Sequence, residues 1–391
     1  MIGLGVIGYG GRAQGVISLI YALNAGVEVT AIVDPRKEEC AKHLESKSKD
    51  PSKVTFYDDP DAMLDSGEID AVLIGTRCSL HSQMARKVLA RNLPLYLEKP
   101  IATNMDDLIA LRDAAEKTES DVVVSFPLRV TPLVQIAREI IDSGKIGTVE
   151  HVVAWNDVPY GGCYYHAWYR DEDETRGLFL QKATHDFDYI NYLLGCKPVM
   201  LCAMNSKQVM KGDKPAGLKC ADCDDWDNCL ESPFHNYYSK AETPSVTTEG
   251  WHTMCGFAVD TGNEDSGSAI IRYETGMHAC YSQNFFARKA AGRRGARFFG
   301  YKGTVEFDWY TNEVKVYVHH RPIVETHRVD TTNMSHGGGD TVLANSFVRM
   351  IKGQEKSVSP LSAGLLSALM CLRAKESAAT NTFQEIKWPD R

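Results

Sequence analysis

The residues best placed to do chemistry follow a short apolar run, where Glu98-Lys99-Pro100 succeeds Leu95-Tyr96-Leu97. The run predicts a buried strand, and the proline bars a helix and fixes the backbone beside the lysine. A lysine at the carboxyl end of a parallel strand lies where open α/β sheets bind ligands. The alternative is a solvated turn with two ordinary surface charges, so this motif needs support from the rest of the chain.

His185 is the second candidate for acid–base chemistry. It lies near the start of a predicted helix that ends at Gly195, and Thr184 is a plausible N-cap. In the first turn of such a helix, the positive dipole end favours a neutral imidazole. Asp188 falls three residues later, on the same side of the helix. A histidine within a helix is usually structural, but this placement fits a proton-transfer group.

A glycine-rich turn, Gly8-Tyr9-Gly10-Gly11-Arg12-Ala13, follows the first apolar run and opens a helical pattern. In this G-x-G-x-x-A arrangement, Gly8 allows the tight turn and Gly10 lets the backbone approach a pyrophosphate. Ala13 permits close packing of helix on strand. The following helix offers free N–H groups and a positive dipole end to phosphates. The turn therefore predicts a dinucleotide site.

The end of the next predicted strand bears on which dinucleotide binds. Asp34 stands there, and a carboxylate in this place accepts hydrogen bonds from a ribose diol and repels a 2′-phosphate. NAD is therefore favoured over NADP, although Arg36 lies close enough to hold a 2′-phosphate. The residues expected to contact the cofactor are Gly8, Tyr9, Gly10, Gly11, Arg12, Ala13, Asp34, Arg36, Thr76, His81, Glu98 and Lys99.

Two further stretches give weaker signals for ligand contact. Thr76 and His81 flank a loop after the fourth predicted strand, where His81 is as readily explained as the first residue of a helix capped by Ser79. The segment 160–170 is rich in aromatic residues and glycines, which suits the faces of sugar rings as well as it suits a core loop. The residues expected to contact a substrate are Lys99, Arg129, Tyr165, His166, Trp168, Gln181 and His185.

An insert at about 211–240 differs in composition from the rest of the chain. Cys220, Cys223 and Cys229 give a C-x2-C-x5-C spacing that suits a structural zinc ion in a segment with little core. Three thiols leave the set one short, so His235, Cys202 or Cys196 would have to complete it. The alternative is a group of free thiols.

The order of predicted elements shows how these residues are positioned. Residues 1–124 alternate strand and helix, which indicates βαβ units and a parallel sheet of the Rossmann type. The predicted strands are Gly3–Ile7, Val27–Val33, Val54–Tyr57, Ala71–Ile74, Leu95–Leu97 and Val122–Val124.

Residues 125–391 read differently, with long strands and few helices between them. They predict a second, α+β domain on a large open, mostly antiparallel sheet, within which Arg293-Arg294 reads as a solvated loop. The expected strands are Val149–Asn156, Pro198–Ala203, Ala269–Arg272, His278–Phe285, Arg297–Gly300, Val305–Asp308 and Glu313–Val318.

Bulk composition excludes some classes of protein. The 391 residues carry a net charge of −8 and no basic run that would track a phosphate backbone, which argues against nucleic acid. No apolar run approaches the roughly 20 residues of a membrane span. Eleven cysteines, an odd number, fit reduced thiols and a cytoplasmic location better than a disulfide framework.

Together these features resemble the glucose–fructose oxidoreductase, inositol dehydrogenase and rhizopine-catabolism (Gfo/Idh/MocA) family. The resemblance covers nearly the whole chain and rests on Gly8-x-Gly10-x-x-Ala13, Glu98-Lys99-Pro100, Arg129, Trp168-Tyr169-Arg170, and His185 with Asp188. It implies a Rossmann domain, a sugar-binding domain whose sheet forms a homodimer or homotetramer interface, and Lys99 and His185 as the catalytic pair. The chain departs from the pattern at Gln181, where an aspartate is usual, and at Thr76-Arg77, where Thr-Pro is usual.

Three functions are consistent with this sequence. The first is an NAD-dependent dehydrogenase acting on a secondary alcohol of a sugar, glycoside or inositol. The second is a glycosidase that uses tightly held NAD for transient oxidation and elimination, with no net redox change. The third is a non-catalytic sugar or cofactor sensor, which the substitution at Gln181 keeps open.

Overall fold

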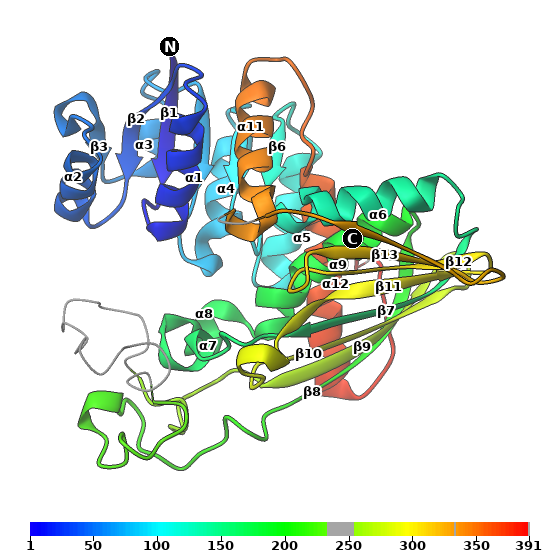
Figure 1. Cartoon of the computed structure of the whole chain (residues 1–391). Helices are drawn as coiled ribbons and strands as arrows, with labels where there is room; N and C mark the ends of the chain where they lie inside the picture. The colour runs from blue at the N-terminus through cyan, green and yellow to red at the C-terminus, as the bar shows by residue number, and fades with distance from the viewer. Residues whose placement is uncertain (233–253, 332–333, 390–391) are drawn as a thin grey trace.

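The computed structural model of the chain describes residues 1–232, 254–331 and 334–389. Two sheets organise these residues. Figure 1 shows the first sheet with its helices in one part of the molecule and a larger, strongly curved sheet in the other. Fold class is as the sequence predicts: a Rossmann-like domain followed by a mostly antiparallel sheet domain.

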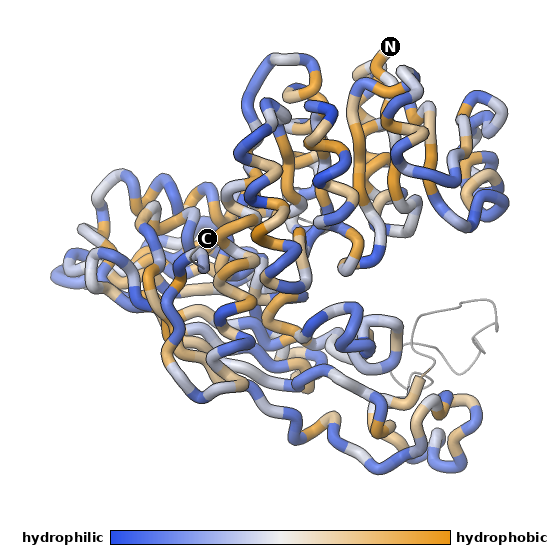
Figure 2. Tube along the Cα trace, turned by 180° about the vertical axis from the view of Figure 1, so that it is seen from behind, coloured by the Kyte–Doolittle hydropathy of each residue, from blue (hydrophilic) through white to orange (hydrophobic). Residues whose placement is uncertain are grey.

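The first sheet is parallel, with the strand order β3-β2-β1-β4-β5-β6. All four residues of β4 are fully buried, which is typical of strands covered on both faces. In Figure 2 the strands of this sheet are hydrophobic along most of their length. The strands are β1 (Ile2–Ile7), β2 (Val27–Val33), β3 (Thr55–Tyr57), β4 (Ala71–Ile74), β5 (Leu95–Leu97) and β6 (Val122–Val124). The helices between them are α1 (Gly11–Ala22), α2 (Lys37–Ser46), α3 (Pro60–Leu64), α4 (His81–Leu89) and α5 (Met105–Ala115).

The second sheet has the order β14-β13-β12-β11-β7-β10-β9-β8-β15, and only the pair β7 and β10 runs parallel. Along β9, buried and exposed residues alternate, so one face of the sheet is covered and the other is open. The strands are β7 (Val149–Asp157), β8 (Pro198–Ser206), β9 (Ser266–Tyr273), β10 (His278–Asn284), β11 (Arg293–Gly300), β12 (Gly303–Asp308), β13 (Glu313–Val318), β14 (Ile323–Arg328) and β15 (Gln384–Glu385).

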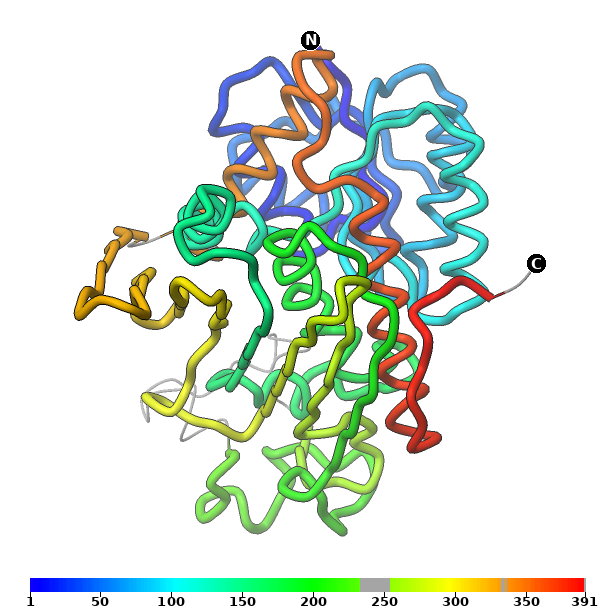
Figure 3. Tube along the Cα trace, turned by 90° about the vertical axis from the view of Figure 1, so that its right-hand side faces the viewer, coloured from blue at the N-terminus to red at the C-terminus, as the bar shows by residue number. Residues whose placement is uncertain are grey.

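Three helices cover the inner face of this sheet: α6 (Pro132–Asp142), α9 (Thr184–Leu194) and α12 (Leu361–Thr380). Figure 3 shows α12 running from the first domain down the side of the second sheet. Aromatic pairs join α9 to the strands, with Phe187 against Tyr281 and Tyr189 against Phe307. The helical layer therefore ties both domains to one core.

One helix of the second half of the chain returns to the first domain. Helix α11 (Gly339–Ile351) packs against α1, and the ring of Phe347 lies 5.6 Å from that of Tyr96 in the first sheet. Figure 1 shows α11 beside α1 and β6. The sequence analysis assigned these residues to the second domain. The packing of α11 on the first domain cannot be deduced from the order of elements along the chain.

Arg293 and Arg294 form the start of strand β11 and are not a solvated loop. Arg294 faces the covered side of the sheet and is buried, where Asp186 accepts from its Nε at 2.8 Å. The prediction failed because a charged pair at a strand end looks like a turn until its buried partner, 108 residues away, is known.

No helix among the described residues combines the length and the apolar character needed to cross a membrane.

Candidate functional site

The glycine turn has the geometry of a phosphate cradle. Gly8 has φ +83°, and a Cβ there would lie 2.6 Å from the backbone nitrogen of Thr76, so only glycine fits. Gly11 has no atom within 4 Å of where its Cβ would stand, and α1 begins there without a side-chain cap. The first N–H groups of α1 therefore remain available to an anion. The residues fit a dinucleotide pyrophosphate.

Asp34 is buried at the end of β2 and accepts hydrogen bonds from the backbone of Tyr9 at 2.9 Å and of Arg36 at 2.9 Å. The guanidinium of Arg36 also donates twice to this carboxylate, each time at 3.1 Å. Burial acts to raise the pKa of Asp34, but the hydrogen bonds from Arg36 outweigh it and the pKa is lowered. An ionised carboxylate therefore lies where a ribose diol would bind. It is already paired with the guanidinium of Arg36.

Arg12 and Glu98, both expected to contact the cofactor, contact each other. The Nε of Arg12 donates to Glu98 at 2.8 Å, and its Nη2 donates to Asp340 at 2.6 Å and to Ser125 at 3.0 Å. This junction, in which Glu98 and Asp340 are buried and Arg12 is partly exposed, joins α1, the end of β5 and the start of α11. In the structure, Arg12 and Glu98 hold these three elements together.

His81 is held by the backbone of two loops, and its contact with a cofactor stays a prediction. The side chain is 2% exposed, and its two ring nitrogens lie 2.7 Å from the Pro100 carbonyl and 3.1 Å from the Thr76 carbonyl. His81 instead joins the loop after β4 to the loop after β5. The expected cap, Ser79, donates to Glu174.

Lys99 lies at the carboxyl end of β5, as the motif predicts. Its Nζ donates to the backbone carbonyl of Gln181 at 3.1 Å, and the side chain is half-buried. Burial lowers the pKa of Lys99 to about 8, with the charge of Lys182 as the next cause. A substantial fraction of Lys99 is therefore neutral near physiological pH and can accept a proton.

Lys182 is a site residue that sequence reasoning missed. It is 7% exposed, and its Nζ donates to the hydroxyl of Tyr160 at 2.5 Å. Burial, followed by the charge of Arg294, lowers the pKa of Lys182 to about 7. The available signal was the position of this lysine, the one charged residue of the segment Gly177–Ala183, directly after Leu178-Phe179-Leu180-Gln181.

His185 lies near Lys99, and its imidazole is kept neutral by burial and not by a helix dipole. Its ring packs edge-on against Phe126, 5.8 Å between centroids, and its buried Nδ1 has no hydrogen-bond partner among the described residues. Burial and then the charge of Lys99 hold the pKa of His185 well below its usual value. A π-helical turn, Phe179–Ala183, leads directly into α9, so Thr184 is not an N-cap and the dipole argument does not apply.

Asp188 does not orient His185. Its carboxylate accepts from Arg129 at 2.7 and 3.0 Å, and both residues are buried. The remaining nitrogen of Arg129, Nη1, donates to the carbonyl of Val358. Arg129 therefore anchors α9 to the segment after β6, and its contact with a substrate stays a prediction.

The side chain of Gln181 also turns away from a substrate. Its Nε2 donates to the Thr175 carbonyl at 2.9 Å, and its amide contacts the thiol of Cys78. The backbone carbonyl of Gln181, not its side chain, meets Lys99. The amide therefore has protein partners, and its contact with a sugar stays a prediction.

The aromatic segment divides into a buried part and an open part. Tyr165 is fully buried and donates to the Glu264 carbonyl, while His166 is 1% exposed and bonds the Met254 carbonyl through Nδ1. That these two residues contact a sugar stays a prediction, although both are buried on protein partners. Trp168 is half-exposed, with its ring stacked 3.9 Å from that of Tyr169 and under the guanidinium of Arg77. Trp168 stays a predicted sugar contact.

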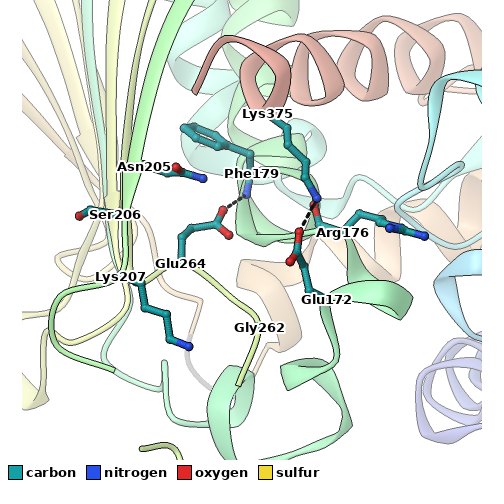
Figure 4. A pocket seen from close by; sticks show the side chains of 9 residues that line it. All are labelled: Glu172, Arg176, Phe179, Asn205, Ser206, Lys207, Gly262, Glu264 and Lys375. Carbon is teal, nitrogen blue, oxygen red and sulfur yellow. Dashed lines mark hydrogen bonds and ion pairs between the residues drawn. The ribbon is translucent and has the colours of Figure 1, made fainter. Parts of the chain in front are cut away.

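A cavity of about 350 Å³ lies apart from these residues (Figure 4). Its charges are largely compensated, because Lys375 pairs with Glu172 at 2.6 Å and Glu264 accepts from two backbone N–H groups. The lining consists of Glu172, Arg176, Phe179, Asn205, Ser206, Lys207, Gly262, Glu264 and Lys375. None of the predicted site residues lines it.

The insert brings a fourth cysteine toward the predicted three. Lys219 pairs with Met254, which places Cys255 beside Cys220. Burial and then the thiols of Cys255, Cys229 and Cys223 raise the pKa of Cys220 to about 12, so the four thiols are neighbours. Cys196 and Cys202 lie at β8 instead, and His235 falls outside the described residues.

The sulfur atoms of the insert do not form a closed metal site. Within residues 1–232, 254–331 and 334–389, the group whose ligand atoms all lie within 4.8 Å of one another is His151, His278 and Cys280, on the open face of the second sheet. The zinc site expected at Cys220, Cys223 and Cys229 stays a prediction.

Comparisons with known proteins agree with this geometry. Residues 2–126 match the family model "Oxidoreductase family, NAD-binding Rossmann fold", and residues 134–306 match the "GFO/IDH/MocA C-terminal domain". A Bacillus subtilis (strain 168) protein named as an oxidoreductase, YteT, is 27% identical over 350 residues, 81% of each chain. The scyllo-inositol 2-dehydrogenase (NAD(+)) of the same strain is 28% identical over 210 residues, 50% of this chain and 54% of that one.

Solved structures show the same fold over the whole length. Levoglucosan dehydrogenase in complex with NADH and L-sorbose has a TM-score of 0.78 at 18% identity, covering 99% of both chains. An oxidoreductase domain protein from Kribbella flavida has a TM-score of 0.77 at 17% identity, also over 99% of both chains. With a Rossmann domain, a glycine cradle and a matching second domain, the chain belongs to the GFO/IDH/MocA family of NAD-binding oxidoreductases.

Proposed function

We propose that the protein is an NAD-dependent dehydrogenase that oxidises or reduces one secondary alcohol carbon of a sugar or cyclitol. The observation that carries the proposal is Lys99, a lysine of lowered pKa held at the same sheet edge as the glycine cradle. The names of relatives support the substrate class, because several are inositol 2-dehydrogenases and one structural neighbour is a levoglucosan dehydrogenase.

The chemistry divides between the cofactor and the protein. A nicotinamide, when bound, accepts the hydride from the alcohol carbon. Neutral Lys99 takes the proton of the hydroxyl, with its Nζ positioned by the Gln181 carbonyl. His185 stays neutral and presents its unpartnered Nδ1 to hold a substrate hydroxyl or pass on the proton.

The finer assignments are part of the same proposal. NAD is preferred to NADP because Asp34 is ionised at the end of β2. Gly8, Gly10, Gly11 and Ala13 hold the pyrophosphate, Tyr9 and Thr76 flank it, and Trp168 offers a face to the sugar ring. A cytoplasmic location and a homodimer or homotetramer stay predictions.

The test is steady-state kinetics of Lys99→Met and His185→Ala beside NAD titrations. Each variant is expected to lose at least ~100-fold in kcat, the usual contribution of an acid–base group, while NAD binds with little change. Lys375→Met, a lysine outside the site, serves as the matched control. Near-normal turnover of Lys99→Met would exclude the proposed base, and near-normal turnover of His185→Ala would exclude the proton route through the imidazole.

A further inference from the structure

The space around Lys99 holds more positive than negative charge. Lys99, Lys182 and Arg294 all act electrostatically on His185, as does His336, so these basic side chains lie near one imidazole. The carboxylate within this group is Asp186, while Glu98 near Lys99 is already paired with Arg12. Burying unpaired cations is costly, so such a surplus calls for an anion.

Lys182 has no carboxylate partner among the described residues. Its hydrogen bond goes to a hydroxyl, that of Tyr160, and its Nζ lies 4.5 Å from the Tyr160 ring centre. Two of its three N–H donors therefore have no acceptor among residues 1–232, 254–331 and 334–389. Tyr160 itself is 44% exposed, so the hydroxyl that Lys182 binds belongs to a ring that meets solvent.

Arg294 is only partly neutralised. Its Nε donates to Asp186 at 2.8 Å, and its buried Nη2 has no hydrogen-bond partner in the described part of the chain. The same carboxylate also accepts from Asn156 at 2.9 Å and Tyr281 at 2.8 Å, so it is shared among three donors. Lys182 and Arg294 lie close enough that the arginine is the largest charge acting on the lysine.

Building on the dehydrogenase function above, we propose that the substrate is an acidic sugar, and that Lys182 and Arg294 bind its carboxylate. One ammonium and one free guanidinium N–H edge match the two oxygens of a carboxylate. A sugar phosphate has the same anionic chemistry but brings a third oxygen and more charge than these donors satisfy. Uronates and aldonates are therefore the substrate class, and neutral sugars and cyclitols bind less well.

The first experiment measures binding and does not depend on turnover. Calorimetric titration of the NADH-loaded protein uses pairs that differ only in the acid group: D-galacturonate against D-galactose, D-glucuronate against D-glucose, and D-gluconate against D-glucitol. At least one acid is expected to bind about 10- to 100-fold more tightly than its neutral partner, the usual effect of a hydrogen-bonded charge. Equal binding within every pair, or binding of no acid, contradicts the proposal.

D-glucose 6-phosphate in the same titration separates the two anions. The proposal expects it to bind more weakly than the preferred acid. If the phosphate binds more tightly than every carboxylate, the assigned substrate class is wrong even though the subsite accepts anions.

The second experiment tests the residue. Lys182→Met should raise the KM for the preferred acid about 10- to 100-fold more than it raises the KM for the neutral partner. Lys375→Met, the matched control, should leave the ratio of the two KM values unchanged. An equal effect of Lys182→Met on both sugars would make Lys182 a structural residue and overturn the assignment. Arg294→Lys tests the second proposed ligand. It keeps a cation beside Asp186, so the protein should fold, but it removes the free guanidinium N–H group and should weaken binding of the acid more than binding of the neutral partner.

Failure of the inference differs from failure of the proposed function. An acid that binds through Lys182 but never reduces NAD contradicts the dehydrogenase and leaves the acidic-sugar subsite standing. Oxidation of the neutral and the acidic sugar at equal efficiency contradicts the acidic-sugar subsite and leaves the dehydrogenase standing.

Discussion

At the scale of residues, two lysines determine the chemistry of the site. Lys99 and Lys182 come from β5 and from the π-helical turn, and burial lowers the pKa of each, to about 8 and about 7. Desolvation disfavours the ammonium form, and each neighbouring cation adds to that effect. In the proposed mechanism, Lys99 can therefore serve as the general base near neutral pH without a carboxylate at position 181.

The pH dependence of kcat/KM tests this coupling. Oxidation needs neutral Lys99, so kcat/KM for a neutral sugar should rise with pH and level off above about 8. Lys182→Met removes the nearest cation, which raises the pKa of Lys99 and moves the rise to higher pH. The profiles of the two proteins should be compared with one substrate and saturating NAD. An unmoved or downward-shifted rise would show that the two lysines are not coupled.

Asp34 and Arg36 give a prediction about cofactor choice. At equal concentrations, NAD should raise the melting temperature of the protein more than NADP does. Asp34→Ser removes the acceptor of the diol and releases Arg36 from its ion pair, so the variant should favour NADP relative to the native chain. The comparison is a thermal shift with both cofactors on both proteins. A native protein that NADP stabilises equally would contradict the assignment.

The sequence identified Lys99, Asp34 and the glycine cradle because each carries a local signal of strand end, turn and spacing. It did not indicate that the polar groups of Gln181, Arg129 and His166 bind partners distant in the chain, namely Cys78, Asp188 and Met254. No pattern in one sequence reveals such pairings.

At the scale of elements, α11 holds the site together from outside the first domain. Asp340 near its start binds Arg12 and His336, and Phe347 on its buried face packs on Tyr96 below the Glu98-Lys99 turn. The helix thereby fixes both the glycine cradle and the end of β5.

Phe347→Ala tests the contribution of this packing. Removing a fully buried phenylalanine should lower the free energy of unfolding by about 3 to 5 kcal/mol. Val342→Ala, at an exposed position of the same helix, should change it by less than about 0.5 kcal/mol. Chemical denaturation of both variants gives the comparison. Equal losses would show that α11 is not packed on the first sheet as described.

The cysteine insert gives a second prediction at this scale. If it closes on zinc, the freshly reduced protein carries near-stoichiometric metal, and a chelator lowers its melting temperature. Cys255→Ser should lose the metal because Cys255 is the neighbour of Cys220, whereas Cys202→Ser should keep it. His278→Ala removes the other candidate group and should not change the zinc content. Metal analysis of the three variants settles the ligands, and protein without metal would end the zinc prediction.

The strands of the first sheet were predictable because their apolar runs are continuous and evenly spaced. The order of the second sheet was not, since its neighbours pair across long separations, as β7 does with both β10 and β11. The start of β11 was missed for the same reason.

At the scale of the whole molecule, the second sheet leaves one face open. Ile270 and Met204 are exposed on this face, and Cys202 lies beside Ile270 in the register. The family resemblance predicts that this face forms the contact between subunits. The opposite face is covered by the helices that position Lys182 and His185, so assembly through the open face would leave the catalytic groups unobstructed.

The central claim is net oxidation of a sugar by free NAD through Lys99. The most direct measurement follows absorbance of reduced nicotinamide together with product, using the native protein and Lys99→Met on acidic and neutral sugars and their glycosides. The account predicts one NADH formed per sugar oxidised by the native protein, and at least ~100-fold less by Lys99→Met. Cleavage of a glycoside without accumulation of NADH, or equal rates for the two proteins, would contradict it.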